Sequence, residues 1–137
     1  MKNYYIVIIL LFTLALSACR GDQQNKLIGV WEQIPFTEPD SIHTYWQFFA
    51  GDALFIYTID EAMKDTTKFL KFAYNVDGST FTVLTGQDDP PYSSAAPDAR
   101  GEYWVDELSN SNLKMTKRKH PDGTTDAVYM RIELVKR

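Results

Sequence analysis

The side chains of this 137-residue chain that could carry out chemistry are few, and their spacing argues against catalysis. Two histidines occur, His43 and His120, without the HxH or HExxH spacing of a zinc site, and both are interpreted as exposed loop residues. Neighbouring carboxylates occur at 60–61, 88–89 and 106–107. Glycosidases hold two carboxylates across a cleft, whereas neighbours on a strand point to opposite faces, so we interpret these pairs as solvated. The sequence predicts neither an enzyme nor a bound metal or cofactor, and a paired-histidine metal site is the alternative.

The only cysteine, Cys19, follows a short apolar segment near the start of the chain. Lys2 is followed by an uncharged run over 4–16, which as a helix would rise about 20 Å, short of the roughly 30 Å hydrocarbon core of a bilayer. A positive start, a short apolar run and small residues before a cleavage point are typical of a signal peptide. An ordinary signal peptide with an incidental cysteine and a transmembrane anchor are the alternatives. A single cysteine also excludes an intrachain disulfide.

Residues 16–19, Leu-Ser-Ala-Cys, resemble the lipobox of bacterial lipoproteins. The resemblance implies that the thiol of Cys19 receives a diacylglyceryl group, that the chain is cut before it, and that the new amino terminus is acylated, for example with palmitate. The implied partner is a membrane, because several acyl chains on one terminus anchor a protein stably. Arg20 is not the aspartate that retains enterobacterial lipoproteins at the inner membrane, so the resemblance favours the outer membrane of the cell envelope.

Cleavage before Cys19 divides the chain into a signal peptide (1–18), a lipidated cysteine with its tether (19–26) and one domain (27–137). The mature part carries 13 basic and 18 acidic side chains, a formal charge of −5, which argues against nucleic acid as a partner. The basic run at 117–120 is interpreted as a solvated strand end, with contact to acidic lipid or polysaccharide as the alternative. Aromatic residues are abundant and helix signals scarce, so the domain is predicted to be all-β.

Eight strands are predicted from the period-two alternation of apolar residues and from the turn residues between segments. They span 26–34, 44–50, 53–59, 67–76, 79–85, 101–108, 112–119 and 126–136. The connections alternate between long and short along the chain, with Gly51-Asp52 and Asp77-Gly78 among the short ones. In an up-and-down meander alternate connections lie at the same end, so this pattern indicates an eight-stranded antiparallel β-barrel with one tight end and one end crowned by long loops. A two-sheet β-sandwich is the alternative.

The direction of the first strand predicts how the barrel is oriented on its anchor. The connection that leaves this strand is long, so the strand runs from the tight end to the looped end, and the mouth faces away from the membrane. The loops expected at the mouth are 35–43, 60–66, 86–100 and 120–125. Because loops on a rigid scaffold are where binding residues tend to lie, they supply the candidate mouth contacts Phe36, His43, Tyr92 and His120.

The first predicted strand carries Gly29-Val30-Trp31. This Gly-x-Trp arrangement at the start of an eight-strand meander resembles the lipocalins, and the resemblance covers roughly 26–136. It implies a barrel whose closed end is formed by Gly29 and Trp31 together with an arginine from near the last strand, for which Arg131 is the matching candidate. A guanidinium over an indole contributes about 0.5–2 kcal/mol.

A candidate cavity wall follows from the same alternation, because pockets for small ligands are mostly apolar. The inward face of the second strand and its cross-strand neighbours supply Trp46, Phe48, Leu54, Ile56, Leu70, Phe72 and Tyr74. Packing of these side chains into a core is the alternative. The leading hypothesis is a lipid-anchored barrel that binds a small apolar ligand or lipid. A protein-interaction or inhibitor module with a filled core that acts through its loops is the second hypothesis, and an uncharacterised hydrolase is the third.

Overall fold

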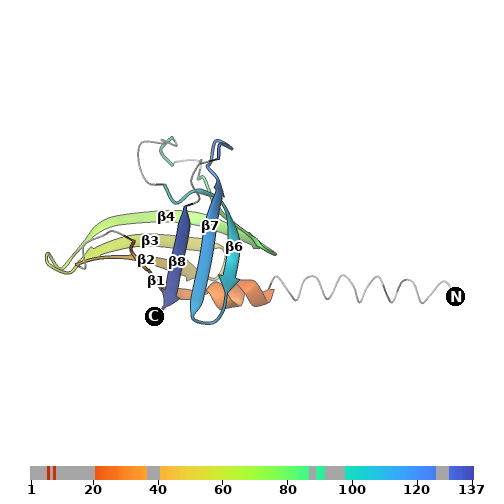
Figure 1. The fold of residues 1–137 in the computed structure, drawn as a ribbon, viewed down its shortest axis with the longest axis horizontal. Coiled ribbons are helices and arrows are strands. Elements are labelled where there is room, and N and C mark those ends of the chain that lie inside the picture. Colours follow the sequence, from red (N-terminus) through yellow and green to blue (C-terminus); the bar gives the residue numbers. More distant parts are fainter. Residues whose placement is uncertain are drawn as a thin grey trace.

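The computed structural model describes residues 6, 8, 21–36, 41–86, 89–91, 98–125 and 130–137, with the backbone alone at 67–69. Within this part of the chain eight antiparallel strands close into a barrel, in which each strand pairs with its sequence neighbours and the first pairs with the last (Figure 1). The strands are β1 (Gly29–Gln33), β2 (Ile42–Phe49), β3 (Ala53–Asp60), β4 (Asp65–Asp77), β5 (Thr80–Leu84), β6 (Gly101–Leu108), β7 (Asn112–Lys119) and β8 (Arg131–Lys136). The predicted up-and-down barrel is confirmed, and the β-sandwich alternative is wrong.

The half of the barrel next to the short β2–β3 and β4–β5 turns is called the lower half, and the half next to the long connections is called the upper half. The inward side chains of alternate strand positions fill the lower half. Trp46 and Phe48 of β2 are buried, as the alternation predicts. Phe48 packs edge-on against Tyr74 of β4, with ring centroids 5.2 Å apart, and Phe81 of β5 lies 5.9 Å from the Phe48 ring. These aromatic contacts form a continuous core below the level of the long loops, and burial of such rings is the main source of stability in a domain of this size.

Several predicted boundaries differ from the structure by one to three residues, because β1, β2, β4 and β5 were predicted at 26–34, 44–50, 67–76 and 79–85. The tight turn between β4 and β5 consists of Gly78 and Ser79 rather than Asp77 and Gly78, because Asp77 still pairs with Thr80. Only Gly78 in this turn takes a positive φ, of 59°. The last strand is described from Arg131, whereas its predicted beginning at 126–129 lies outside the described residues.

The segment that was predicted to be a tether is largely a short helix. Residues 21–27 are helical, and Leu27 at its end is buried in the core. Gln23 donates a hydrogen bond to the carbonyl of Gly78, and Gln24 donates one to the carboxylate of Asp52, at 2.9 and 2.7 Å. The helix therefore plugs the barrel end that carries the short β2–β3 and β4–β5 turns. The polar composition concealed this role, because the contacts that hold the helix come from turns far away in the sequence.

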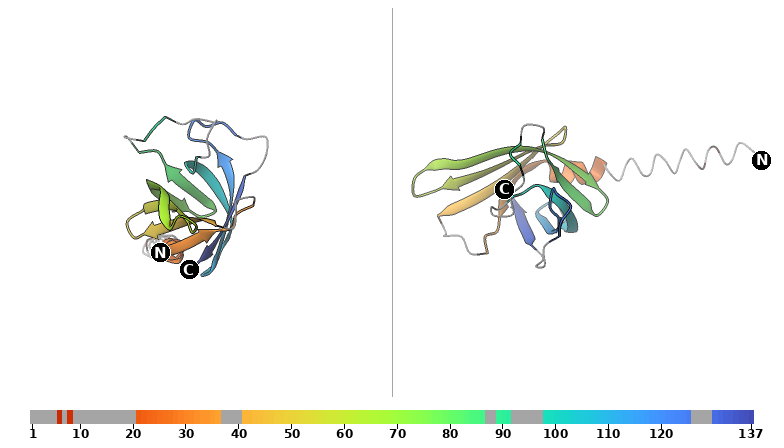
Figure 2. Two further views of the ribbon diagram at one scale, coloured as in Figure 1. Left: turned by 90° about the vertical axis from the view of Figure 1, so that its left-hand side faces the viewer. Right: turned by 90° about the horizontal axis from the view of Figure 1, so that it is seen from above.

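The entry of the chain at the tight end agrees with the predicted direction of the first strand. Figures 1 and 2 show the helix, in orange, at one end of the molecule and the β3–β4 turn at the other. The hydrogen bonds of Gln23 and Gln24 to two short turns place residue 26 at the end opposite the segment that leads into β6. In the described part of the chain, no helix combines the length and the apolar character needed to cross a bilayer.

The cation that packs on Trp31 is Lys136 and not Arg131. Trp31 is fully buried, and its indole nitrogen donates a hydrogen bond to the carbonyl of Leu27, at 2.7 Å. The Lys136 ammonium lies 5.2 Å from the centre of the indole ring and donates to the carbonyl of Lys26. Arg131 lies at the other end of β8 and pairs with Glu133 instead, at 3.0 Å. The predicted role of Arg131 is wrong because Trp31 pairs in register with Lys136, five residues further along β8.

This register also explains the glycine of the Gly-x-Trp arrangement. A Cβ at Gly29 would lie 2.8 Å from Cε of Lys136, and the residue has a φ of +133°. A side chain at this position would therefore displace the lysine from the indole, in addition to straining the backbone.

Replacing Lys136 by alanine is expected to lower the melting temperature by about 5–10 °C, because a cation over an indole and a charged hydrogen bond are both lost. The matched control is Arg131→Ala. It removes an exposed ion pair whose contribution is under about 1 kcal/mol, and it should melt close to the wild type. Thermal unfolding followed by circular dichroism makes the comparison, and a larger loss in Arg131→Ala than in Lys136→Ala would contradict this account of the closed end.

Candidate functional site

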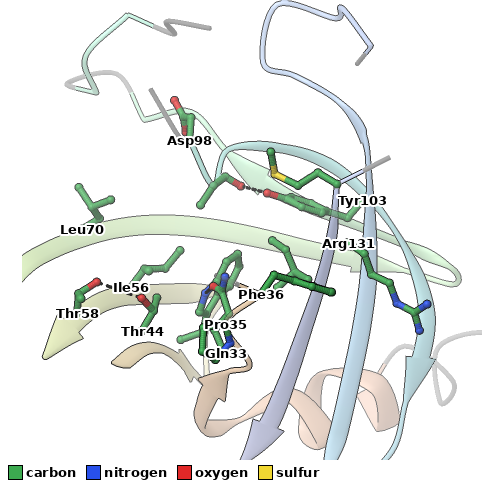
Figure 3. A pocket seen from close by; sticks show the side chains of 14 residues that line it. Gln33, Pro35, Phe36, Thr44, Ile56, Thr58, Leu70, Asp98, Tyr103 and Arg131 are labelled. Atoms are coloured by element: carbon green, nitrogen blue, oxygen red, sulfur yellow. Dashed lines mark hydrogen bonds between the residues drawn. The ribbon is translucent and has the colours of Figure 1, made fainter. Parts of the chain in front are cut away.

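A cavity of about 450 Å³ lies inside the upper half of the barrel, beneath the long connections (Figure 3). Three separate connections reach it, because its lining includes Pro35 and Phe36 after β1, Asp98 and Ala99 before β6, and Met130 before β8. The strands contribute the remaining lining residues, which are Gln33, Thr44, Trp46, Ile56, Thr58, Leu70, Tyr103, Arg131 and Ile132. Apolar side chains predominate, and this composition is typical of pockets for small organic molecules.

The predicted cavity wall is divided between this cavity and the core below it. Three of its seven residues line the cavity: Trp46, Ile56 and Leu70. The other four belong to the packed interior, and they are Phe48, Leu54, Phe72 and Tyr74. Alternation placed all seven on the inner face. Their position along each strand, toward the long connections or toward the short turns, decides which of them face open space. Some of the seven residues therefore form the cavity wall, as predicted, and the others pack into the core, as the alternative proposed.

The predicted mouth residues are dispersed. Phe36 lines the cavity and is 75% exposed, so it stands at the rim. His43 lies within β2 rather than in a loop, and its Nδ1 is 2.6 Å from Oε1 of Glu32. Because Thr44 and Trp46 line the cavity, the odd-numbered His43 belongs to the outer face of β2. His120 follows the end of β7, and its amide donates to the carbonyl of Thr124. Tyr92 lies outside the described residues.

The sequence analysis did not identify the polar residues of the cavity lining. Thr44 and Thr58 place their hydroxyl oxygens 3.3 Å apart across the β2–β3 pair. Gln33, at the end of β1, accepts a hydrogen bond from the indole nitrogen of Trp46 at 3.0 Å. Alternation could have identified both threonines, since each is two positions from an inward residue, Trp46 or Ile56.

An ion-pair cluster holds the segment that enters β6 over the cavity. The guanidinium of Arg100, 4% exposed, forms a two-pronged pair with the carboxylate of Asp98 and also donates to the carbonyl of Pro90. Burial alone would raise the pKa of Asp98, but the hydrogen bonds and charge of Arg100 outweigh it, so this pKa lies below its ordinary value. The carboxylate is therefore ionised at neutral pH, and the buried pair fixes the conformation of the segment just before β6.

Lys117 adds a second buried cation to this cluster, contrary to the interpretation of 117–120 as a solvated strand end. It is 6% exposed, and its ammonium donates to the carbonyl of Asp98 at 2.5 Å and lies 5.5 Å from the centre of the Tyr103 ring. Arg118, the next residue, points outward and pairs with Glu102. Burial raises the pKa of the Tyr103 phenol, which donates to the carbonyl of Ala99 and remains neutral at physiological pH.

Three carboxylates on the outer face of the barrel pair with neighbouring polar groups. Asp106 accepts from the hydroxyl of Thr116, and Glu107 pairs with Lys114. Glu32 pairs with Arg137 and with His43, and although burial would raise its pKa, these two partners hold it below the ordinary value. Among the residues that the structure describes, no group of three histidine, cysteine, aspartate or glutamate side chains is arranged to hold a metal ion.

Comparisons with protein-family models, with curated proteins and with solved structures give no match to this chain. The resemblance to lipocalins therefore depends on Gly29, Trp31 and the order of strands. The closed barrel is compatible with it. Function must be argued from the cavity itself, because a fold alone does not specify what a protein binds.

Proposed function

We propose that this chain is the precursor of a lipid-anchored lipoprotein of the cell envelope, whose barrel binds a small apolar ligand or lipid. The observation that supports the proposal is the cavity of about 450 Å³, which falls within the roughly 300–1,000 Å³ typical of small-molecule sites. A core that served stability alone would be close-packed throughout, as the lower half of this barrel is.

The chemistry of the lining favours an apolar ligand. Trp46, Ile56, Leu70 and Ile132 present rings and branched aliphatic groups to the cavity. The charged residues that line it are already paired, Asp98 with Arg100 and Arg131 with Glu133. Figure 3 shows the guanidinium of Arg131 turned away from the cavity. Transfer of an apolar molecule from water into the cavity is therefore favourable, by about 25 cal/mol for each Å² of apolar surface that it buries.

The anchor in this proposal is Cys19, which lies outside the described residues. The lipobox resemblance of 16–19 supports lipidation there, and Arg20 favours the outer membrane. Since the described chain enters the barrel at its tight end, through the helix of 21–27, lipidation would hold that end toward the membrane and leave the cavity mouth facing away from it.

Replacing Cys19 by serine is expected to abolish lipidation, because a hydroxyl does not form the thioether. Cells that express the full chain are labelled with an alkynyl analogue of palmitate, and the label is detected on the purified protein. Ser17→Ala is the control, since it keeps a small residue before the cut and should remain labelled. Label that persists in Cys19→Ser would rule out this modification site.

Native mass spectrometry of the protein isolated from its own host tests the ligand-binding proposal. We expect a small additional mass that is retained in the folded state and lost on denaturation. A protein that carries no additional small mass and takes up no apolar compound in titrations would contradict the proposal.

A second candidate function is protein interaction through the loop end. Phe36 and Met130 are both exposed at the rim, and such side chains are common at contact surfaces. The same mass measurement separates the candidates, because a partner protein would add kilodaltons whereas a small ligand would add hundreds of daltons.

A further inference from the structure

The side-chain amide of Gln33 has a defined orientation at the edge of the cavity. Its oxygen lies 3.0 Å from the indole nitrogen of Trp46. An indole N–H only donates, so the atom that faces it must be the amide oxygen and not the amide nitrogen. The hydrogen bond thereby leaves the NH₂ group of Gln33, with its two donors, on the other side of the amide.

No described residue accepts a hydrogen bond from this NH₂ group, since the contact with Trp46 is the only hydrogen bond that Gln33 makes through its side chain. Gln33 is also part of the cavity lining. An apolar group packed against this nitrogen would remove water from it and leave its donors unsatisfied, which is unfavourable. A ligand that places an oxygen there would satisfy them.

Gln33 belongs to a polar corner of a lining that is mostly apolar. Glu32 pairs in register with Tyr45, so the next position along β1, Gln33, lies beside Thr44 of β2, and Thr44 pairs with Thr58 of β3. Figure 3 shows Gln33, Thr44 and Thr58 on one side of the cavity, with Leu70 and Tyr103 on the other. The amide and the two hydroxyl groups thus gather on one side of the cavity, where apolar lining residues such as Ile56 also lie.

We propose that Gln33 is a specificity-determining residue, and that the ligand is an amphiphile with an apolar body and an oxygen acceptor that accepts a hydrogen bond from the Gln33 amide. This inference rests on the proposed ligand-binding function. The apolar body lies against Leu70 and Ile132, and the acceptor oxygen, as a ketone, ester, hydroxyl or carboxylate, lies at the corner formed by Gln33 and Thr44.

The test compares two compounds of nearly the same shape, 2-acetylnaphthalene and 2-isopropenylnaphthalene, which differ in having C=O or C=CH₂. Their dissociation constants are measured by displacement of the neutral dye N-phenyl-1-naphthylamine. The variant Gln33→Glu keeps an oxygen for Trp46 but loses the donor. We expect the ratio of the two affinities to fall by roughly tenfold in this variant, the size of one hydrogen bond, while the hydrocarbon binds as before.

Gln33→Met provides a second variant of similar size that has no donor and no added charge, and the same fall in the ratio is expected. An unchanged ratio in either folded variant would overturn the role of Gln33 and leave ligand binding intact. If neither compound displaces the dye from the wild type and the dye itself does not bind, the proposed function fails instead. Tighter binding of 2-naphthoate that is lost in Gln33→Met would support the inference and assign the acceptor to a carboxylate.

Discussion

Leu70→Trp is expected to abolish binding of apolar compounds while the barrel stays folded. Leu70 lies in β4 and lines the cavity, where it is only partly buried. An indole at this position would project into the space of about 450 Å³ that a ligand must occupy. Because the added atoms enter an existing cavity instead of a close-packed core, the stability cost should stay within the roughly 1–3 kcal/mol typical of overpacking.

The control for this variant is Leu84→Trp. Leu84 ends β5 and is 42% exposed. It follows the inward Phe81 and Val83 in the alternation of the strand, so it faces outward. Both variants replace a leucine by tryptophan, and they differ in whether the indole enters the cavity. Titration with N-phenyl-1-naphthylamine should give no binding for Leu70→Trp and wild-type affinity for Leu84→Trp. Equal binding by the two folded variants would show that the apolar compound occupies another place.

Gly101→Ala is expected to be the most destabilising small substitution in the described chain, at about 2–6 kcal/mol. Gly101 begins β6 with a φ of +126°, and a Cβ built there would collide with the backbone carbonyl oxygen of Lys119 on the paired strand β7. A backbone atom within a sheet cannot move aside as a flexible side chain can. The strand pair would have to separate where it already carries an irregularity, between Glu102 and Tyr103.

Gly123→Ala provides the matched comparison, because Gly123 also has a positive φ, of +82°, but no atom lies within 4 Å of the added Cβ. This variant bears the conformational strain alone, about 1–2 kcal/mol. At roughly 4 °C for each kcal/mol, we expect the melting temperature to fall by more than about 8 °C in Gly101→Ala and by about 4–8 °C in Gly123→Ala. Similar melting temperatures for the two would mean that the contact with Lys119 is relieved at little cost.

The order and approximate bounds of the strands follow from local sequence alone. Alternation of apolar and polar residues selects extended segments, and turn residues such as Gly51-Asp52 separate them, so β3, β6 and β7 were located to within one residue at each end. The alternating lengths of the connections also predicted the up-and-down order and the end at which the chain enters. Both inferences depend only on neighbours in the sequence, and they required no knowledge of contacts between distant segments.

The identity of the cation on Trp31 was decided by the tertiary structure. Arg131, Lys136 and Arg137 lie within seven residues in and just after the last strand, and which of them reaches the indole depends on the face and the register of β8 against β1. The observed register sets Lys136 opposite Trp31. Register depends on how the closed sheet staggers its strands, and this property arises from all eight strands together.

For the cavity, too, the sequence determined one part and the tertiary structure the other. The period of two in each strand determined that Trp46, Phe48, Leu70 and Tyr74 face inward. It did not determine which of them meet other side chains and which meet open space. The lower half is filled because Phe48, Tyr74 and Phe81 converge from three strands, whereas the upper half is left open beneath the connections. Whether inward side chains meet across the barrel depends on its diameter and on the stagger of opposite strands, and neither is a property of any one segment of sequence.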